Sequence, residues 1–211
     1  MIHITRKEIN SLDKRYRANL INSVTGYKSA NLIGSISPDG ITNLTIVSSV
    51  IHLGSDPPLI GFIQRPVTVR RDTYENITKN GYFTINHVHG EFIEKAHQTS
   101  AKFDGNISEF DACGLNQEYL ADFKAPYVRE SKIKLGMRLV QETPIYQNGT
   151  ILMIGEIVDL HISELSLEKN GSLDLNIIND VCISGLDTYH QVSYKASLSY
   201  AKPNQSVSLV K

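Results

Sequence analysis

The chain has 211 residues, of which 41% are hydrophobic and 20% are charged, so it has enough apolar material for one globular domain with a sizeable core. Its 21 Lys and Arg balance 22 Asp and Glu, so no overall charge draws it to nucleic acid or to an anionic membrane. No apolar run approaches the roughly 20 residues of a membrane span, and the N-terminus lacks the apolar stretch of a signal peptide. We therefore expect one cytoplasmic domain over residues 1–211, with neither nucleic acid nor membrane as a partner.

The first 25 residues mix charged side chains with regularly spaced apolar ones. Ile9, Leu12, Tyr16 and Leu20 recur among Lys and Arg side chains. That spacing predicts a short amphipathic helix, or two helical turns, packed outside a core.

Strand signals begin at residue 30 and are separated by turn residues. Asp39-Gly40 marks one turn and Pro57-Pro58 marks another, because these residue types favour tight turns. The expected strands cover residues 30–37, 41–49, 59–65 and 82–86, with a helix at 72–80 before the last of them.

Two further strands are expected in the second half of the chain. Residues 132–139 alternate apolar and polar side chains, as in a half-buried antiparallel strand. Residues 150–162 are apolar on both faces, and Gly155 in their middle indicates a bulge or a bend of the kind that closes a barrel. The many strands, with only short helical segments between them, predict a mainly β barrel.

The helices are expected to be few and short. Asp72 and Glu75 have the spacing of a capping box, and Gly81 is placed to end that helix. A second helix is predicted at 91–97. Residues 99–129 are rich in turn formers and predict a long loop with a helical turn at residues 116–123.

Cations and hydroxyls flank the start of the 72–80 helix. A helix start attracts phosphate through unpaired N–H groups and its dipole, and Arg71 and Thr73 stand there. Arg65 and Thr68 follow the preceding strand and are placed to hold the same phosphate from the other side. These residues alone leave two interpretations open, a phosphate site or a capped surface helix with solvated arginines.

Small hydroxyl side chains end the second expected strand. Thr45 and Ser49 share one face, and Ser48 lies on the other. Such side chains let a flat heterocycle approach the backbone, but solvent-facing hydroxyls on an edge strand are the stronger interpretation without further information. Asn86, at the end of a later strand, is similarly ambiguous.

The histidines and cysteines do not define a site by their spacing. His87, His89 and His97 match no recognised zinc pattern, so exposed or hydrogen-bonded histidines are the favoured interpretation. Cys113 and Cys182 lie far apart without a CxxC pair, which indicates reduced structural thiols.

Taken in order, these segments resemble the flavin reductase family of FMN-binding split barrels, from about Arg17 to Pro203. The resemblance rests on the order of several short motifs, none of which is specific alone. They are Asp39-Gly40 to Asn43, Ser48-Ser49, Asp56-Pro57-Pro58-Leu59, Arg71-Asp72-Thr73, Asn76-Ile77, Tyr82 to Asn86, Ser108-Glu109-Phe110, Ile154 to Ile157, and Gly185 to His190.

The resemblance implies a six-stranded split β-barrel with Greek-key topology, a few short peripheral helices, and a homodimer with FMN at the subunit interface. It also implies which residues bind FMN. They are Asn43, Ser48 and Ser49 along the flavin ring and ribityl chain, Gln64, Arg65, Thr68, Arg71 and Thr73 around the phosphate, and Asn86 and Tyr189 elsewhere in the pocket. His190, beside Tyr189 at the pocket mouth, is the expected catalytic residue.

The implied activity is hydride transfer from NAD(P)H to the flavin, in a protein that orients the cofactor and excludes water. One alternative is a non-catalytic FMN carrier or sensor. Another is a barrel like the pyridoxine-phosphate oxidases, which would bind a different phosphorylated heterocycle. The sequence leaves open the final electron acceptor, the choice between NADH and NADPH, and how tightly FMN is held.

Overall fold

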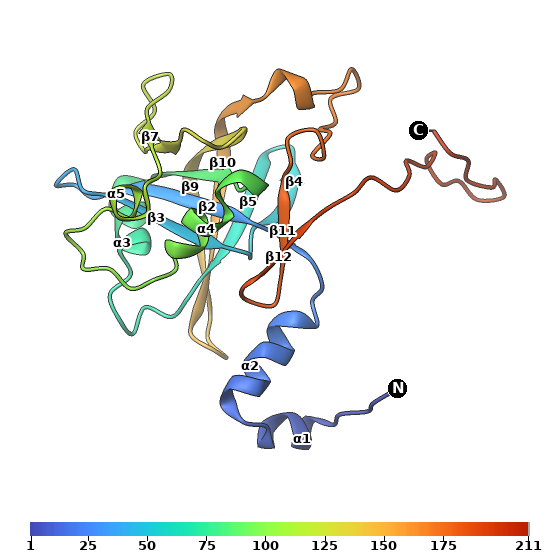
Figure 1. Ribbon diagram of the computed structural model, residues 1–211, viewed down its shortest axis with the longest axis horizontal. Coiled ribbons are helices and arrows are strands. Elements are labelled where there is room, and N and C mark those ends of the chain that lie inside the picture. The colour runs from blue at the N-terminus through green and yellow to red at the C-terminus, as the bar shows by residue number, and fades with distance from the viewer. Residues whose placement is uncertain (211) are drawn as a thin grey trace.

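A computed structural model describes residues 1–210 and is dominated by one antiparallel sheet (Figure 1). Its strands lie in the order β3-β2-β6-β9-β10-β5-β4, and every neighbouring pair is antiparallel. They are β2 (Asn31–Ile36), β3 (Thr42–Val47), β4 (Ile51–Ser55), β5 (Pro58–Gln64), β6 (Tyr82–His87), β9 (Ile133–Ile145) and β10 (Thr150–Ile162).

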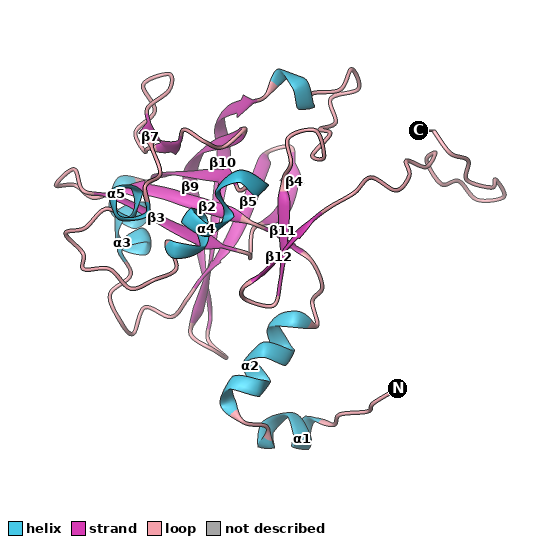
Figure 2. Ribbon diagram, in the orientation of Figure 1, coloured by secondary structure: helices cyan, strands magenta, loops and turns pink. Residues whose placement is uncertain are grey.

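Two small sheets and a few short helices surround this sheet (Figure 2). One small sheet has the order β1-β11-β12 and the other pairs β7 with β8. Their strands are β1 (Lys28–Ser29), β7 (Gln117–Glu118), β8 (Tyr127–Val128), β11 (Val181–Ser184) and β12 (Thr188–Gln191). The helices are α1 (Arg6–Ser11), α2 (Lys14–Ser23), α3 (Asp72–Asn80), α4 (Ile93–Gln98) and α5 (Glu109–Cys113), with 3₁₀ turns η1 (Gly90–Phe92) and η2 (Glu164–Ser166). Within residues 1–210, no helix has the length and apolar character needed to cross a membrane.

The main sheet is rolled because a short link joins its two edges. β3 and β4 stand at opposite ends of the strand order, yet only residues 48–50, here called the edge link, connect them. Four Cα–Cα steps reach at most about 14 Å, whereas the edges of a flat seven-stranded sheet would lie about 29 Å apart. The sheet therefore curls until β3 and β4 come close, without becoming a continuous hydrogen-bonded barrel within the described residues.

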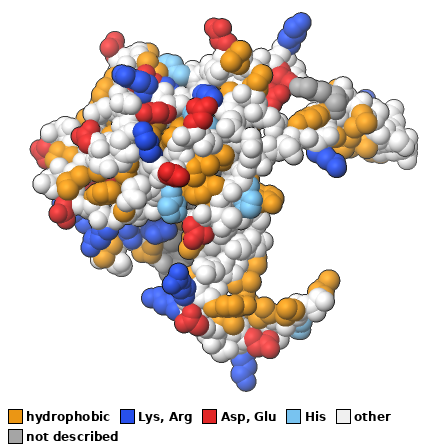
Figure 3. All heavy atoms as spheres, viewed as in Figure 1, with side chains coloured by type: hydrophobic (Ala, Val, Ile, Leu, Met, Phe, Trp, Pro, Cys, Tyr) orange, Lys and Arg blue, Asp and Glu red, His pale blue; other side chains and the backbone are white. Residues whose placement is uncertain are grey.

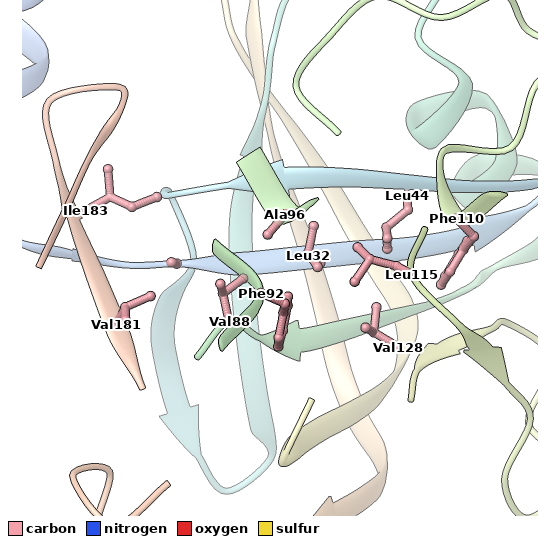
Figure 4. Packing of buried hydrophobic residues seen from close by; sticks show 11 residues of the cluster. Leu32, Leu44, Val88, Phe92, Ala96, Phe110, Leu115, Val128, Val181 and Ile183 are labelled. Atoms are coloured by element: carbon pink, nitrogen blue, oxygen red, sulfur yellow. The ribbon is translucent and has the colours of Figure 1, made fainter. Parts of the chain in front are cut away.

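The rolled sheet separates two hydrophobic cores. One is enclosed by the sheet and α3, and it contains Ile33, Phe62, Phe83 and Met137. The other lies on the opposite face of β2, β3 and β6, where α4, α5 and β11 cover it (Figure 4). Together these cores bury most of the apolar side chains of the strands, which is the dominant stabilising contribution in such a fold.

Gly155 is required where β10 bends around the enclosed core. The pairing of β10 with β9 shifts register between Ile154 and Gly155, as expected for a bulge. A Cβ on Gly155 would lie 2.8 Å from Cζ of Phe83 and 3.1 Å from Cε of Met137. The predicted role of Gly155 as a bend in the strand is therefore confirmed.

The mainly β fold and most strand positions agree with the sequence prediction, but the strand count does not. The main sheet has seven strands where the resemblance implied six. The prediction missed β4, because it assigned no strand to the residues between the strand at 41–49 and the turn at Pro57-Pro58.

Three local predictions were wrong or incomplete. Residues 116–123 were expected to form a helical turn, but they contain the strand β7 followed by a turn. The helix within the predicted 99–129 loop is α5. β9 extends six residues beyond its predicted end at Leu139, to Ile145. Lys134, a polar residue of the alternating strand predicted at 132–139, is buried where it pairs with Glu118 of β7.

Replacing Gly155 with Ala should destabilise the protein by about 1–3 kcal/mol, because the added methyl overpacks the enclosed core. Gly54→Ala in β4 is the matched control, since the nearest atom to its Cβ would be the Pro57 carbonyl oxygen at 3.6 Å. Urea unfolding midpoints, measured at one protein concentration, should fall for Gly155→Ala and stay near the wild-type value for Gly54→Ala. Equal midpoints for the two variants would contradict the role given to Gly155.

Candidate functional site

The edge link lies against the end of β5. The hydroxyl of Ser49 accepts a hydrogen bond from the backbone N–H of Ile63, with 3.1 Å between Ser49 Oγ and Ile63 N. The ladder of β4 with β5 begins with Ile51 opposite Gly61, so Ser49 continues this pairing through its side chain. As a result, Ser48 and Ser49 lie beside the loop that follows β5.

The loop of residues 65–71 carries several of the predicted site residues. Gln64 is buried, and its Nε2 donates to the carbonyl oxygen of Arg65 at 3.2 Å. Arg65 and Thr68 are exposed, whereas Arg71 is half-buried and its Nε donates to the carbonyl oxygen of Pro66 at 3.3 Å. The structure thus brings the side chains of Gln64, Arg65 and Arg71 to one loop next to the edge link.

Helix α3 begins directly after this loop and presents uncapped N–H groups. Arg71 is its N-cap residue and no side chain of the described residues caps the first turn. The predicted capping box is therefore wrong, because Asp72 is the first helical residue and its carboxylate pairs with Nε of Arg70 at 2.7 Å. The predicted end of the helix is confirmed, since Gly81 adopts φ of 72° as its C-cap.

Two predicted ligand residues belong instead to a buried polar network. Thr73 Oγ1 donates to Asn43 Oδ1 at 2.6 Å, and Asn43 Nδ2 donates to Glu109 Oε2 at 2.9 Å. Ser35 also donates to Asn43 Oδ1, at 3.3 Å, and it accepts from Asn76 at 3.2 Å. The hydroxyl proton of Thr73 and the amide of Asn43 are therefore already used, and these side chains fasten α3 to β2 and β3.

Glu109 is a hydrogen-bonded, partly buried carboxylate to which the sequence analysis assigned no role. Its Oε2 accepts hydrogen bonds from Asn43 Nδ2 and, at 3.0 Å, from the backbone N–H of Leu44. Burial raises the pKa of the Glu109 carboxyl, and these hydrogen bonds only partly oppose that effect. A small cavity of about 130 Å³ beside it is lined by side chains of both charges, among them Asp72 and Arg70.

Asn86 lies elsewhere and holds the sheet together. Its Nδ2 donates to the Leu32 carbonyl oxygen at 3.2 Å and to Thr84 Oγ1 at 2.8 Å. Its Oδ1 accepts from the backbone N–H of Val128 at 3.0 Å. The side chain is fully buried, so the assignment of Asn86 to ligand binding is not supported by its geometry.

Tyr189 and His190 lie on β12 and point to opposite faces of the small sheet. The Tyr189 hydroxyl lies 3.0 Å from Nδ1 of His97, and both Tyr189 and Ile46 pack against the same hydrophobic core. Burial raises the pKa of Tyr189 to about 12. His190 faces the other way, with Nε2 2.7 Å from Ser184 Oγ and its ring edge-on to Tyr27.

The remaining histidines and both cysteines have structural surroundings. His87 Nδ1 lies 2.6 Å from Asp180 Oδ2, and His89 Nε2 lies 2.9 Å from the Glu130 carbonyl oxygen. Among residues 1–210, no three His, Cys, Asp or Glu side chains gather as metal ligands would. Cys113 and Cys182 are buried free thiols, as predicted, and burial raises the pKa of each.

Residues 28–176 match the family described as flavin reductase like domain. A crystal structure from Shewanella frigidimarina NCIMB 400, provisionally named a flavin reductase with split barrel domain, is 50% identical to the chain. The match covers 95% of this chain and 100% of that one, with a TM-score of 0.92.

Two more distant relatives extend the comparison. The crystal structure of nitrilotriacetate monooxygenase component B from Bacillus cereus shares the fold at 21% identity, covering 94% of this chain and 98% of its own, with a TM-score of 0.83. An uncharacterised protein of Aquifex aeolicus (strain VF5) is 29% identical over 140 residues, which are 65% of this chain and 70% of the relative.

The raised pKa of Glu109 predicts a pH dependence of stability. Burial of the charged Glu109 carboxylate lowers the stability of the folded protein. This cost is absent below the ordinary carboxyl pKa of 4.5, where the carboxyl is protonated in both the folded and the unfolded state. It reaches its full size above the raised pKa of the folded state. Glu109→Gln keeps an oxygen that accepts from Asn43 and Leu44 but does not titrate. Its stability relative to wild type should therefore rise as pH increases from 4.5 to 7, as measured by urea midpoints. A constant or falling difference would contradict this reading of Glu109.

Proposed function

The chain belongs to the flavin reductase like domain family, a flavin-binding family, and from that premise we propose that it is an FMN-binding oxidoreductase that uses NAD(P)H to reduce the flavin. The observation that carries the proposal is the meeting of the edge link, the 65–71 loop and the start of α3 at one place. The cytoplasmic location stays a prediction.

The donor groups at this place fit a phosphate dianion. Arg65 and Arg71 supply two cations, and Thr68 supplies an exposed hydroxyl. The uncapped first turn of α3 adds backbone N–H groups and the positive end of the helix dipole. Asp72 does not oppose an anion here, because Arg70 neutralises its carboxylate. We therefore assign the FMN phosphate to Arg65, Thr68, Arg71 and the backbone of α3, without the hydroxyl of Thr73.

The edge link suits the polar edge of a flat ring. Ser48 and Ser49 are small and half-buried, so a heterocycle can approach their backbone closely. Gln64 is buried next to them and keeps its carboxamide oxygen as an acceptor. When bound, FMN would supply the hydride-accepting ring, and these residues would orient it and shield it from water.

The nicotinamide is proposed to approach from the side of β12. Tyr189 packs against the same core as Ile46, near the end of β3 from which the edge link leaves. His97 and Tyr189 hold each other through a hydrogen bond, so this wall of the pocket is already ordered. We assign His190, on the other face of β12, to contact with the second substrate.

We also propose the homodimer and the Greek-key topology that the family resemblance implies. Val158 and Leu160 of β10 are 47% and 49% exposed, and Ile51 and Leu53 of β4 are 43% and 42% exposed. Exposed apolar side chains on surface strands are typical of an interface between subunits.

Mass spectrometry of the ligand released from the purified protein tests the cofactor, and NAD(P)H oxidation with added FMN tests the activity. FMN together with turnover supports the proposal. FMN without turnover would indicate a flavin carrier, and a different phosphorylated heterocycle would indicate the oxidase-like alternative.

Arg71→Ala and Arg65→Ala should each weaken FMN binding by about 1.5–3 kcal/mol, or roughly ten- to hundredfold. Each change leaves the phosphate dianion with less positive charge around it, whereas riboflavin, which lacks that phosphate, should be almost unaffected. Fluorescence titrations with the two flavins measure the difference.

Arg70→Ala combined with Asp72→Ala is the matched control for these arginines. Arg70 precedes Arg71 in the same loop, but its guanidinium pairs with Asp72 and lies against Gly105. Removing both members of this ion pair leaves the net charge near the phosphate unchanged, so FMN affinity should change little in the double variant. If FMN and riboflavin weaken by the same factor in Arg65→Ala and Arg71→Ala, the phosphate assignment fails.

His190→Ala should slow flavin reduction by NAD(P)H by about tenfold, the effect of losing about 1.4 kcal/mol of transition-state stabilisation. FMN affinity should change less, because His190 contacts Ser184 and Tyr27 rather than the 65–71 loop. Ser184→Ala is the control, since it removes the hydrogen bond to His190 but keeps the imidazole. Stopped-flow reduction and flavin titration separate the two effects, and equal losses in both would show that His190 supports the cofactor instead.

A further inference from the structure

Two extensions leave the body of the protein from the same small sheet. The N-terminal extension, residues 1–27, ends at β1, and the C-terminal arm, residues 192–210, begins after β12. Because β1 and β12 both pair with β11, the extensions depart from neighbouring points. Figure 1 shows them projecting away from the main sheet in different directions, with open space between them.

The two extensions contain no buried residue, although the Tyr27 ring lies edge-on to His190 where the N-terminal extension meets the small sheet. Helices α1 and α2 contain no buried residue, although Tyr16, Ile21 and Val24 are apolar and exposed. The arm also contains no buried residue from 192 to 210. In Figure 3, apolar side chains are visible along both extensions.

The arm is an amphipathic hairpin with one uncovered apolar face. Ser199 N donates to the Ser208 carbonyl oxygen at 2.9 Å, and Leu198 pairs with Leu209 across the hairpin. Residues opposite one another in an antiparallel pair share a face, so Leu198, Tyr200, Val207 and Leu209 lie together. Their exposed fractions are 59%, 88%, 50% and 73%, in that order.

An isolated two-stranded hairpin is marginally stable in water, so this one needs a surface to pack on. The match to the Shewanella crystal structure covers 95% of this chain with a TM-score of 0.92. The unmatched twentieth of the chain is shorter than either extension. At least part of each extension therefore lies within the match to a protein of 50% identity, so the extensions are not peculiar to this chain.

The net charges of the extensions and of the body indicate which surface the extensions bind. Residues 28–191 carry 13 Lys and Arg against 20 Asp and Glu, a net charge of −7. The two extensions, residues 1–27 and 192–211, carry eight Lys and Arg against two Asp and Glu, a net charge of +6. Extension and body are thus electrostatically complementary.

We propose that the N-terminal extension and the C-terminal arm of one copy clasp the acidic body of a second copy, reciprocally, in a two-fold dimer. The apolar face of the arm packs on the partner, and the basic extension helices add electrostatic attraction. This inference rests on the homodimer of the proposed function but not on its flavin chemistry. In such an isologous dimer each subunit both gives and receives the two extensions.

Cross-linking of mixed isotopes tests which copy the arm contacts. Unlabelled and ¹⁵N-labelled proteins are co-refolded and treated with a lysine-reactive cross-linker, and peptides containing Lys195 or Lys202 are identified by mass spectrometry. Mixed-isotope cross-links from these arm lysines to residues 28–191 are expected. The proposal is overturned if every arm-to-body cross-link joins two peptides with the same isotope label. It is also overturned if the wild-type protein is monomeric by light scattering at micromolar concentration.

Substitutions on the two faces of the arm provide a matched comparison. Leu198→Asp with Leu209→Asp places charges on the apolar face, whereas Ser199→Asp with Ser208→Asp places the same charges on the other face. Light scattering of the flavin-free proteins should show that the first pair raises the dimer dissociation constant at least about a hundredfold, and the second far less. Equal effects of the two pairs would overturn the role of the apolar face. Since no flavin is present, this result does not depend on whether the proposed activity is correct.

Discussion

The fold depends on the length of one connection, the edge link between β3 and β4. Three residues cannot span a flat seven-stranded sheet, so the sheet must roll, and rolling encloses the core around Phe62 and Phe83. The same connection brings Ser48 and Ser49 to the end of β5, where Ser49 takes over the pairing of the ladder. The constraint that rolls the sheet therefore also builds the candidate site.

Buried polar side chains then fix the elements around the rolled sheet. β3 is an edge strand, and its outward N–H groups at Leu44 and Ile46 donate to Glu109 and Thr99 rather than to another strand. Such capping protects an edge from pairing with other chains. Through Asn43 the same network holds α3, so the helix start that faces the 65–71 loop has a fixed position. Residues that do not contact the ligand in this account still position the groups that do.

The sequence was sufficient to predict the strands with clear periodicity. It was less informative about polar side chains whose role depends on tertiary contacts. The strand at 150–162 and the helix stop at Gly81 followed from local rules. Polar residue type alone could not distinguish a ligand contact from a buried network, so Thr73 and Asn86 were both assigned to the ligand. Their partners, Asn43 and Val128, lie 30 and 42 residues away in the chain, and no local pattern reveals such contacts. Glu109 was missed for the same reason, although a carboxylate within a loop that covers an edge strand was the available signal.

The most direct test of the central claim is hydrogen–deuterium exchange of the protein with and without FMN. If the edge link and the 65–71 loop form the flavin site, peptides covering residues 47–51 and 63–72 should exchange more slowly when FMN is bound. Residues 37–42 and 104–109, around the charged cavity beside Glu109, should keep their exchange rates. Protection centred on that cavity, with none at residues 47–51, would contradict the account.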